Sequence, residues 1–121
     1  MTIATFSLVA LDCPDPHALA AFYQQIVGGE ANQLTSDDEW VQLNIEGTSN
    51  IAFQRDDDYR PPGWPDGTPQ QAHLDFDVTD LDEGEAAVLA IGAVKAEVQP
   101  RSDRWRVFID PAGHPFCLVL V

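Results

Sequence analysis

Apolar residues recur with two different periods along the first half of the chain. Residues 5–12 form a short, mostly apolar run, which fits a buried strand. The segment after it carries large apolar residues at the spacing of one helix face: Leu19, Phe22, Tyr23 and Ile26. Asp15 stands where it can cap the first turn of this helix, and Gly28 stands where the helix should end. The chain is therefore predicted to open with a strand followed by a helix.

Three strands are expected after this helix. Residues 39–47 alternate apolar and polar side chains with the period of a half-buried strand, and residues 49–55 are predicted to form the next one. A weaker pattern predicts a further strand between Glu30 and Thr35. Pro, Gly and Asp dominate residues 56–69, so a connector without regular structure is expected there.

The second half repeats this order of elements. Residues 72–78 alternate like a strand, and residues 79–93 predict a helix in which Asp80 and Glu83 have the spacing of a capping box. Gly84 lies inside that helix at a cost of roughly 1 kcal/mol relative to alanine, which close packing against it would explain. Three more strands are expected, at residues 93–99, 104–110 and 115–121.

A shift of 65 positions superimposes the two halves, so that Leu8 coincides with His73 and Trp40 with Trp105. The predicted fold is therefore α+β, built from two βαβββ modules. Within a single domain of residues 1–121, the expected parts are module one at about 1–56, a linker at about 57–69 and module two at about 70–121.

The charge of the chain narrows the range of its partners. Twenty acidic residues against six basic ones give a formal net charge of −14, which repels nucleic acids and anionic membrane surfaces, and no basic cluster is seen to offset it. No apolar run reaches the roughly 20 residues that cross a bilayer, and the N-terminus lacks a signal-peptide pattern. A cytoplasmic protein is expected, in which Cys13 and Cys117 are buried, unpaired residues.

Three segments carry a resemblance to a known family: LDCPDPHALAAFY at 11–23, AHLDFDVTDLD at 72–82 and DPAGHPFCLVLV at 110–121. With the linker, they resemble the glyoxalase/bleomycin-resistance/extradiol-dioxygenase proteins, the vicinal oxygen chelate superfamily, and in particular its glyoxalase-like subgroup. The resemblance implies an eight-stranded cup with the helices outside, a ligand or metal inside the cup, and a homodimer. Because that superfamily contains lyases, isomerases, dioxygenases and non-catalytic antibiotic binders, the resemblance alone does not choose a function.

Strand alternation predicts which side chains line this implied cup. Leu74, Phe76 and Val78 should pack under a helix, so the side chains of alternate residues should face the other way. The predicted ligand-binding residues are Trp40, Gln54, His73, Asp75, Trp105 and Cys117. The indoles suit stacking on a flat or cationic ligand, and equally suit a core or a dimer interface.

The resemblance places metal ligands at Leu8, Gln54, His73 and Cys117. Leu8 has no donor atom, and no carboxylate stands at any of the four positions, so no metal is expected. If a divalent metal binds, His73 with Gln54 and Cys117 would hold it. Asp75 could join His73 and Cys117 in a zinc-like set, but neighbouring residues on one strand face have Cβ atoms roughly 6–7 Å apart and are expected to point in parallel.

Two classes of function follow from these residues. The favoured hypothesis is a small-molecule-binding protein with a degenerate metal site, its ligand held in the cup. The alternatives are a metal-dependent lyase, isomerase or dioxygenase, and a metal-free enzyme in which Asp75 orients His73 as a general base. If the indoles fill the cup, a structural or partner-docking role would be favoured instead. His17 is expected to face solvent, and His114 to belong to a structural turn.

Overall fold

The computed structural model describes residues 2–3, 5–33 and 38–121. The chain divides into two compact units, residues 1–59 and residues 60–121, and each is described by itself. None of the helices in the described part is long and apolar enough to cross a membrane.

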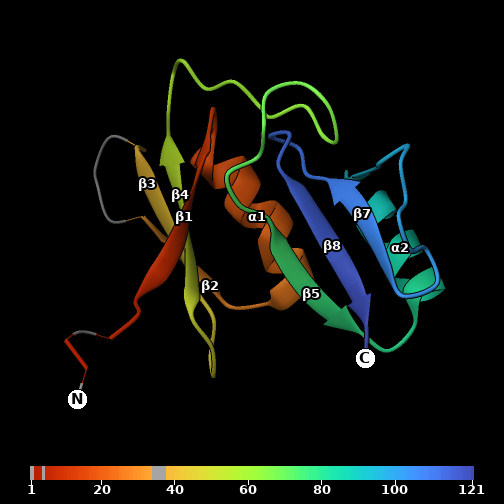
Figure 1. Cartoon of the computed structure of the whole chain (residues 1–121). Coiled ribbons are helices and arrows are strands. Elements are labelled where there is room, and N and C mark those ends of the chain that lie inside the picture. Colours follow the sequence, from red (N-terminus) through yellow and green to blue (C-terminus); the bar gives the residue numbers. More distant parts are fainter. Residues whose placement is uncertain (1, 4, 34–37) are drawn as a thin grey trace. The chain divides into compact units, whose positions relative to one another are not determined.

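The first unit contains one helix and one four-stranded sheet (Figure 1). Its elements are β1 (Leu8–Cys13), α1 (Pro16–Val27), β2 (Glu30–Gln33), β3 (Trp40–Asn44) and β4 (Asn50–Arg55). The strands lie in the order β1-β4-β3-β2, with β1 parallel to β4 and the other pairs antiparallel. The weakly predicted second strand is therefore present as β2, and residues 34 and 35 of that prediction lie outside the described residues.

Helix α1 packs on β3 and β4 through the apolar face that its sequence predicts. Asp15 caps the helix, with its side chain accepting a hydrogen bond from the Ala18 backbone N–H at 3.2 Å. Tyr23 is fully buried and stacks on Phe53 of β4, with their ring centres 5.7 Å apart. Burying a ring of this size removes a large apolar surface from water, so this contact stabilises the hydrophobic core of the first unit.

The second unit has the same arrangement. Its elements are β5 (Leu74–Val78), α2 (Leu81–Ala90), β6 (Val94–Lys95), β7 (Trp105–Ile109) and β8 (Pro115–Leu120). The strand order is β5-β8-β7-β6, with β5 parallel to β8. The prediction of an α+β chain with two βαβββ modules is confirmed.

Gly84 of α2 has the packing role that its position suggests. A Cβ atom added there would lie 3.1 Å from Leu118 Cδ1 and 3.3 Å from Val78 Cγ1. Both distances are tighter than ordinary van der Waals contact. Glycine therefore lets α2 approach β5 and β8 more closely than alanine would.

One predicted strand is much shorter in the structure. Residues 93–99 were expected to be extended, but only Val94 and Lys95 pair with β7 as strand β6. The Gln99 side chain explains the early end, because its amide donates to Val107 O at 2.8 Å and accepts from Val107 N at 2.9 Å. The Ala96 backbone N–H still donates to Val107 O at 3.1 Å, whereas the Val107 N–H is taken by the Gln99 side chain instead of a strand partner.

Candidate functional site

The chemically reactive side chains of the second unit meet where β5 begins. His73 stands immediately before β5, Asp75 lies in it, and Cys117 is directly opposite Asp75 on β8. His73 Nε2 is 3.3 Å from Asp75 Oδ1. One ligand atom from each of the three residues lies within 4.8 Å of the other two.

This convergence corrects the expectation that His73 and Asp75 point in parallel. The expectation considered only their Cβ atoms, whereas the imidazole and the carboxylate each extend beyond Cβ and lean toward one another. His73 also precedes the first paired residue of β5, so the strand pairing does not fix its backbone. The side chains therefore meet although they belong to one face of one segment.

Cys117 is held as a thiol rather than a thiolate. Burial, the charge of Asp75 and a hydrogen bond to that carboxylate together raise the pKa of Cys117 to about 11, with burial the largest cause. A thiol with this pKa is a weak nucleophile at neutral pH. The cluster therefore does not resemble an activated cysteine enzyme, in which a neighbouring base lowers the thiol pKa.

A small pocket opens beside this cluster. Its volume is about 170 Å³, and its lining residues all belong to the second unit: Trp64, Gln70, His73, Trp105, Val107, Pro115 and Cys117. Trp64 and Trp105 are half-buried and pack against the buried cluster of Ala96, Val107 and Cys117. The pocket therefore has aromatic walls and an imidazole and a thiol at one end.

Gln70 adds an unsatisfied polar group to this lining. Its side-chain oxygen Oε1 is buried and accepts no hydrogen bond from the residues that the structure describes. A buried acceptor without a donor costs about 1–3 kcal/mol. A donor supplied from outside the chain would remove that cost.

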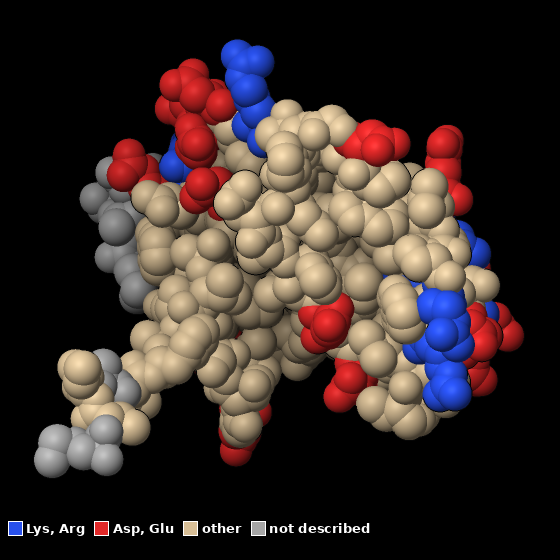
Figure 2. All heavy atoms as spheres, viewed as in Figure 1, with Lys and Arg blue, Asp and Glu red and all other residues tan. Residues whose placement is uncertain are grey.

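Trp105 is also flanked by a cation. The guanidinium carbon of Arg101 lies 6.0 Å from the centre of the Trp105 ring, within the range of a cation–π interaction. Four of the six basic residues of the chain fall between positions 95 and 106, which corrects the expectation that the chain has no basic cluster. Figure 2 shows basic side chains gathered near β7. Three of the four are ion-paired: Lys95 with Glu85, Arg101 with Asp103, and Arg106 with Asp82 and Glu85.

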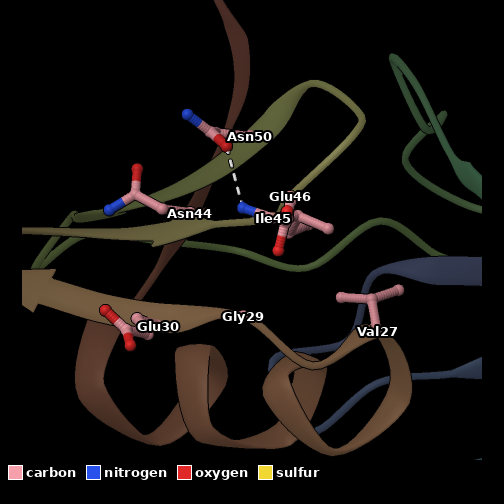
Figure 3. Close-up of a pocket in the computed structure, with 7 residues that line it drawn as sticks. All are labelled: Val27, Gly29, Glu30, Asn44, Ile45, Glu46 and Asn50. Carbon is pink, nitrogen blue, oxygen red and sulfur yellow. Dashed lines mark hydrogen bonds between the residues drawn. The ribbon is translucent and has the colours of Figure 1, made fainter.

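The first unit holds a larger and more polar hollow (Figure 3). Its volume is about 620 Å³, and it is lined by Val27, Gly29, Glu30, Asn44, Ile45, Glu46 and Asn50. Its two amides already have partners, since Asn50 Oδ1 accepts from the Ile45 backbone N–H and Asn44 Oδ1 accepts from Gln42 Nε2, each at 2.9 Å. No histidine or cysteine contributes to this lining, so it has less chemistry to offer than the smaller pocket.

The predicted site residues divide between the two units. Four of them belong to the second unit: His73, Asp75, Trp105 and Cys117. His73, Asp75 and Cys117 converge there, and Trp105 lines the same pocket as His73 and Cys117. Trp40 and Gln54 belong to the first, where they face each other across β3 and β4.

The remaining histidines behave as predicted. His17 is half-exposed at the first turn of α1, and its Nε2 lies 2.9 Å from Asp38 Oδ1. His114 belongs to the turn before β8, where its backbone N–H donates to the buried Asp110 carboxylate at 2.9 Å. That carboxylate also accepts from the Ala112 N–H, so the turn is held by its own hydrogen bonds.

Comparison with known proteins identifies the family. Residues 8–119 match the glyoxalase-like domain. The chain belongs to this family. A search among curated proteins finds no significant match.

Several solved structures share the fold at low sequence identity. A glyoxalase/bleomycin resistance protein/dioxygenase family enzyme from Burkholderia phytofirmans PsJN is 23% identical, with a TM-score of 0.74 over 98% of this chain and 99% of that one. The fosfomycin resistance protein FosX from Listeria monocytogenes is 22% identical, with a TM-score of 0.72 over 99% and 93%. A mutant of that FosX, complexed with Mn(II) and 1S,2S-dihydroxypropylphosphonic acid, is 21% identical, with a TM-score of 0.71 over 98% and 93%. The predicted membership of the vicinal oxygen chelate superfamily is confirmed.

The strand register of this glyoxalase-like chain agrees with the shift of 65 positions between its modules. Asp75 is paired with Cys117 on β8, and Ala10, 65 positions before Asp75, is paired with Ala52 on β4. Ala52 is therefore the counterpart of Cys117, whereas Gln54, which the resemblance suggests as a metal position, lies two residues further along β4. Two of the four positions that the resemblance suggests for a metal thus lie in the second unit, and Asp75 adds a third donor there.

Two lining residues were missed by the sequence reasoning. Trp64 and Gln70 are not among the ligand-binding residues that strand alternation predicts, because both belong to the segment before β5. For Trp64 a signal was available, because it is the only residue of 61–67 that is not Pro, Gly or Asp, and a large aromatic side chain in such a segment suggests that it packs on something. Nothing in the local pattern marks Gln70.

Proposed function

We propose that this glyoxalase-like protein binds a small organic molecule in the pocket of its second unit. The observation that carries the proposal is the pocket itself, in which two indoles, an amide, an imidazole and a thiol surround one space of about 170 Å³. Binding sites for small molecules are usually lined by apolar and aromatic groups with a few polar groups that fix orientation. The lining has that composition.

The size and lining suggest what part of a ligand enters. A cavity of about 150 Å³ accommodates benzene, so a single flat ring of that size would fill this pocket. Trp64 and Trp105 would contact its faces or edges, and Arg101 beyond Trp105 favours electron-rich over cationic rings. A ligand N–H or O–H would give Gln70 Oε1 the donor that it lacks. The ligand class is therefore a small, neutral or anionic ring with a hydrogen-bond donor.

We also propose that the four metal positions suggested by the resemblance do not act together. Leu8 offers no donor, and Gln54 offers only a neutral oxygen. Such a set lacks the charged oxygen ligands that Mn(II) favours. The Mn(II) complex of the Listeria FosX therefore supports ligand binding by this fold, and does not carry its metal over to the same positions here.

An enzymatic function is the second candidate, and the contact between His73 and Asp75 favours it. A carboxylate 3.3 Å from an imidazole nitrogen can fix the orientation of the ring, as a general base requires. His73 lies at the edge of the pocket, where it would face the bound molecule. Proton abstraction from a carbon or hydroxyl group of the ligand is the reaction class that this geometry allows.

The proposal is tested by measuring the affinity of small aromatic probes such as phenol, benzoate and nicotinamide by tryptophan fluorescence. Binding by the unmodified chain should weaken at least about fivefold in Trp105→Ala, because a buried aromatic contact contributes about 1 kcal/mol or more. The matched control is Glu46→Ala, at the exposed rim of the first unit's hollow, which should bind the probes unchanged. Equal loss in both variants, or no binding by any probe, would refute the proposal.

A further inference from the structure

We propose that His73, Asp75 and Cys117 form a Zn²⁺ site contained entirely in the second unit. The three side chains supply a nitrogen, an oxygen and a sulfur donor, one from each, within 4.8 Å of one another. This set differs from the four-position set that the resemblance suggests, because Asp75 replaces both Leu8 and Gln54.

The distance between the nitrogen and oxygen donors matches that in a tetrahedral zinc site. Nitrogen and oxygen ligands at about 2.0–2.1 Å from zinc lie about 3.3–3.4 Å apart along a tetrahedral edge. His73 Nε2 and Asp75 Oδ1 are 3.3 Å apart. Cys117 is directly opposite Asp75 in the strand register, and its sulfur lies within 4.8 Å of the other two donor atoms, which places it near a third corner.

The donor types select the metal. Thiolate and imidazole are soft or borderline ligands that favour zinc, whereas Mg²⁺, Ca²⁺ and Mn²⁺ favour sets made of oxygen. The carboxylate and the thiolate together carry two negative charges, which balance the dication. On binding, the S–H bond of Cys117 breaks, its proton passes to solvent, and the sulfur bonds to the metal.

The fourth position of such an ion would be open toward the pocket. His73 and Cys117 both belong to the pocket lining, and three protein ligands with one open position are typical of zinc that contacts a ligand or water. An oxygen or nitrogen donor on the bound molecule would occupy that position. This last step rests on the proposed function, whereas the metal site itself does not.

The test is the titration of chelator-treated protein with Zn²⁺ by calorimetry, and with Co²⁺ by absorption spectroscopy. One equivalent of each metal should bind, and the cobalt form should show a thiolate-to-metal charge-transfer band. Cys117→Ser should abolish that band, and Asp75→Asn and His73→Ala should each weaken zinc binding at least about tenfold. Asp75 is exposed, so Asp75→Asn carries the test if the buried Cys117 variant does not fold.

The matched control is the other histidine–aspartate pair. His17 Nε2 and Asp38 Oδ1 are 2.9 Å apart on the first unit, and both side chains are half-exposed. His17→Ala should leave zinc affinity and the cobalt spectrum unchanged. Three results would refute the proposed site: equal zinc affinity in all variants, a loss of zinc affinity in His17→Ala, or a cobalt complex without the charge-transfer band.

Failure of this inference can be separated from failure of the proposed function. Aromatic probes are measured by fluorescence on the chelated protein, so their binding does not depend on the metal. Probe binding without zinc binding would remove only the metal site. If zinc binds and requires Asp75 and Cys117, but no aromatic probe binds, only the proposed binding of a small molecule would be refuted.

Discussion

The two modules share one strand plan and differ in the side chains that it brings together. In the first, β1 pairs with β4 so that Ala10 lies opposite Ala52; in the second, β5 pairs with β8 so that Asp75 lies opposite Cys117. Residue Leu8 of the first module corresponds to His73 of the second. The same backbone therefore presents three apolar side chains in one module and three potential metal ligands in the other. The chemistry depends on those residues and not on the fold.

The modules also attach their helices differently. Val41 of β3 is buried and belongs to the first core, whereas its counterpart in β7, 65 positions later, is Arg106. Arg106 pairs with Asp82 and Glu85 of α2 at 2.9 and 3.3 Å. The hydrogen bond and the charge of Asp82 raise the pKa of Arg106 above its already high value, so it stays charged. One helix is thus held by apolar burial and the other partly by ion pairs.

The largest expected effect comes from transferring the metal ligands to the first module. Leu8→His, Ala10→Asp and Ala52→Cys together reproduce the donor set on the equivalent strands, and a second equivalent of zinc should then bind. Elemental analysis and cobalt absorption measure it. A folded triple variant that still binds one equivalent would show that the shared strand plan is not enough to build the site.

The next effect is on the rate at which the Cys117 thiol is alkylated. With a pKa of about 11 against an ordinary 9.0, Cys117 should have roughly a hundredfold lower thiolate fraction near pH 8 than a free thiol. In a Cys13→Ala background, the rate of alkylation by iodoacetamide should rise with pH toward that value. Asp75→Asn should move the profile to lower pH, because it removes a negative charge beside the thiol. If Asp75→Asn leaves the pH dependence of alkylation unchanged, the charge of Asp75 does not contribute to the raised pKa of Cys117.

The same shift makes stability depend on pH in the alkaline range. The folded state keeps the Cys117 proton more tightly than the unfolded state, so its contribution is complete below about pH 9.0 and is lost as the pH rises toward about 11. Urea unfolding at pH 8 and pH 11 should show this loss, and Cys117→Ala should lose less. An equal loss in that variant would assign the pH dependence to other groups.

A smaller effect separates the two ways of attaching a helix. Val41→Ala should lower the free energy of unfolding by about 2 kcal/mol, with little dependence on salt, because it removes buried methyl groups. Arg106→Ala should lower it by about 1 kcal/mol, and less at high salt, because its nearer partner, Asp82, is largely exposed to solvent. Urea titrations at two salt concentrations measure both. If the two variants show the same salt dependence, ion pairs do not hold α2 any more than they hold α1.

The smallest effect concerns Gln70. Gln70→Leu removes the buried acceptor without a donor, so it should raise the free energy of unfolding by about 1 kcal/mol while weakening the binding of probes that carry a donor. Benzoate, which has no donor at neutral pH, should lose less affinity than phenol. A loss of stability in this variant would show that Gln70 has a partner in solution.

The sequence predicts most of the fold, because local signals agree with one another. Asp15 and Asp80 cap the helices as expected, and strand alternation correctly separates buried Val41 and Leu43 from their neighbours. It overestimates β6, since the Gln99 side chain replaces strand pairing by a contact that no periodicity reveals.

The candidate site could be predicted from the sequence only in part. His73, Asp75, Trp105 and Cys117 were identified by face and by resemblance, but the convergence of His73 and Asp75 depends on side-chain directions beyond Cβ. Trp64 and Gln70 reach the pocket through a connector whose path follows no regular pattern. The homodimer stays a prediction, for which light scattering of the purified chain is the direct measurement.

The central claim is that the second unit holds the ligand. Its most direct test is a ¹H–¹⁵N spectrum of the protein titrated with phenol. The indole N–H signals of Trp64 and Trp105 should shift, while the backbone amides of Asn44, Ile45 and Glu46 in the first unit's hollow should not. The Trp40 signal reports separately whether that predicted residue joins the site. Shifts confined to the first unit's hollow would contradict the account.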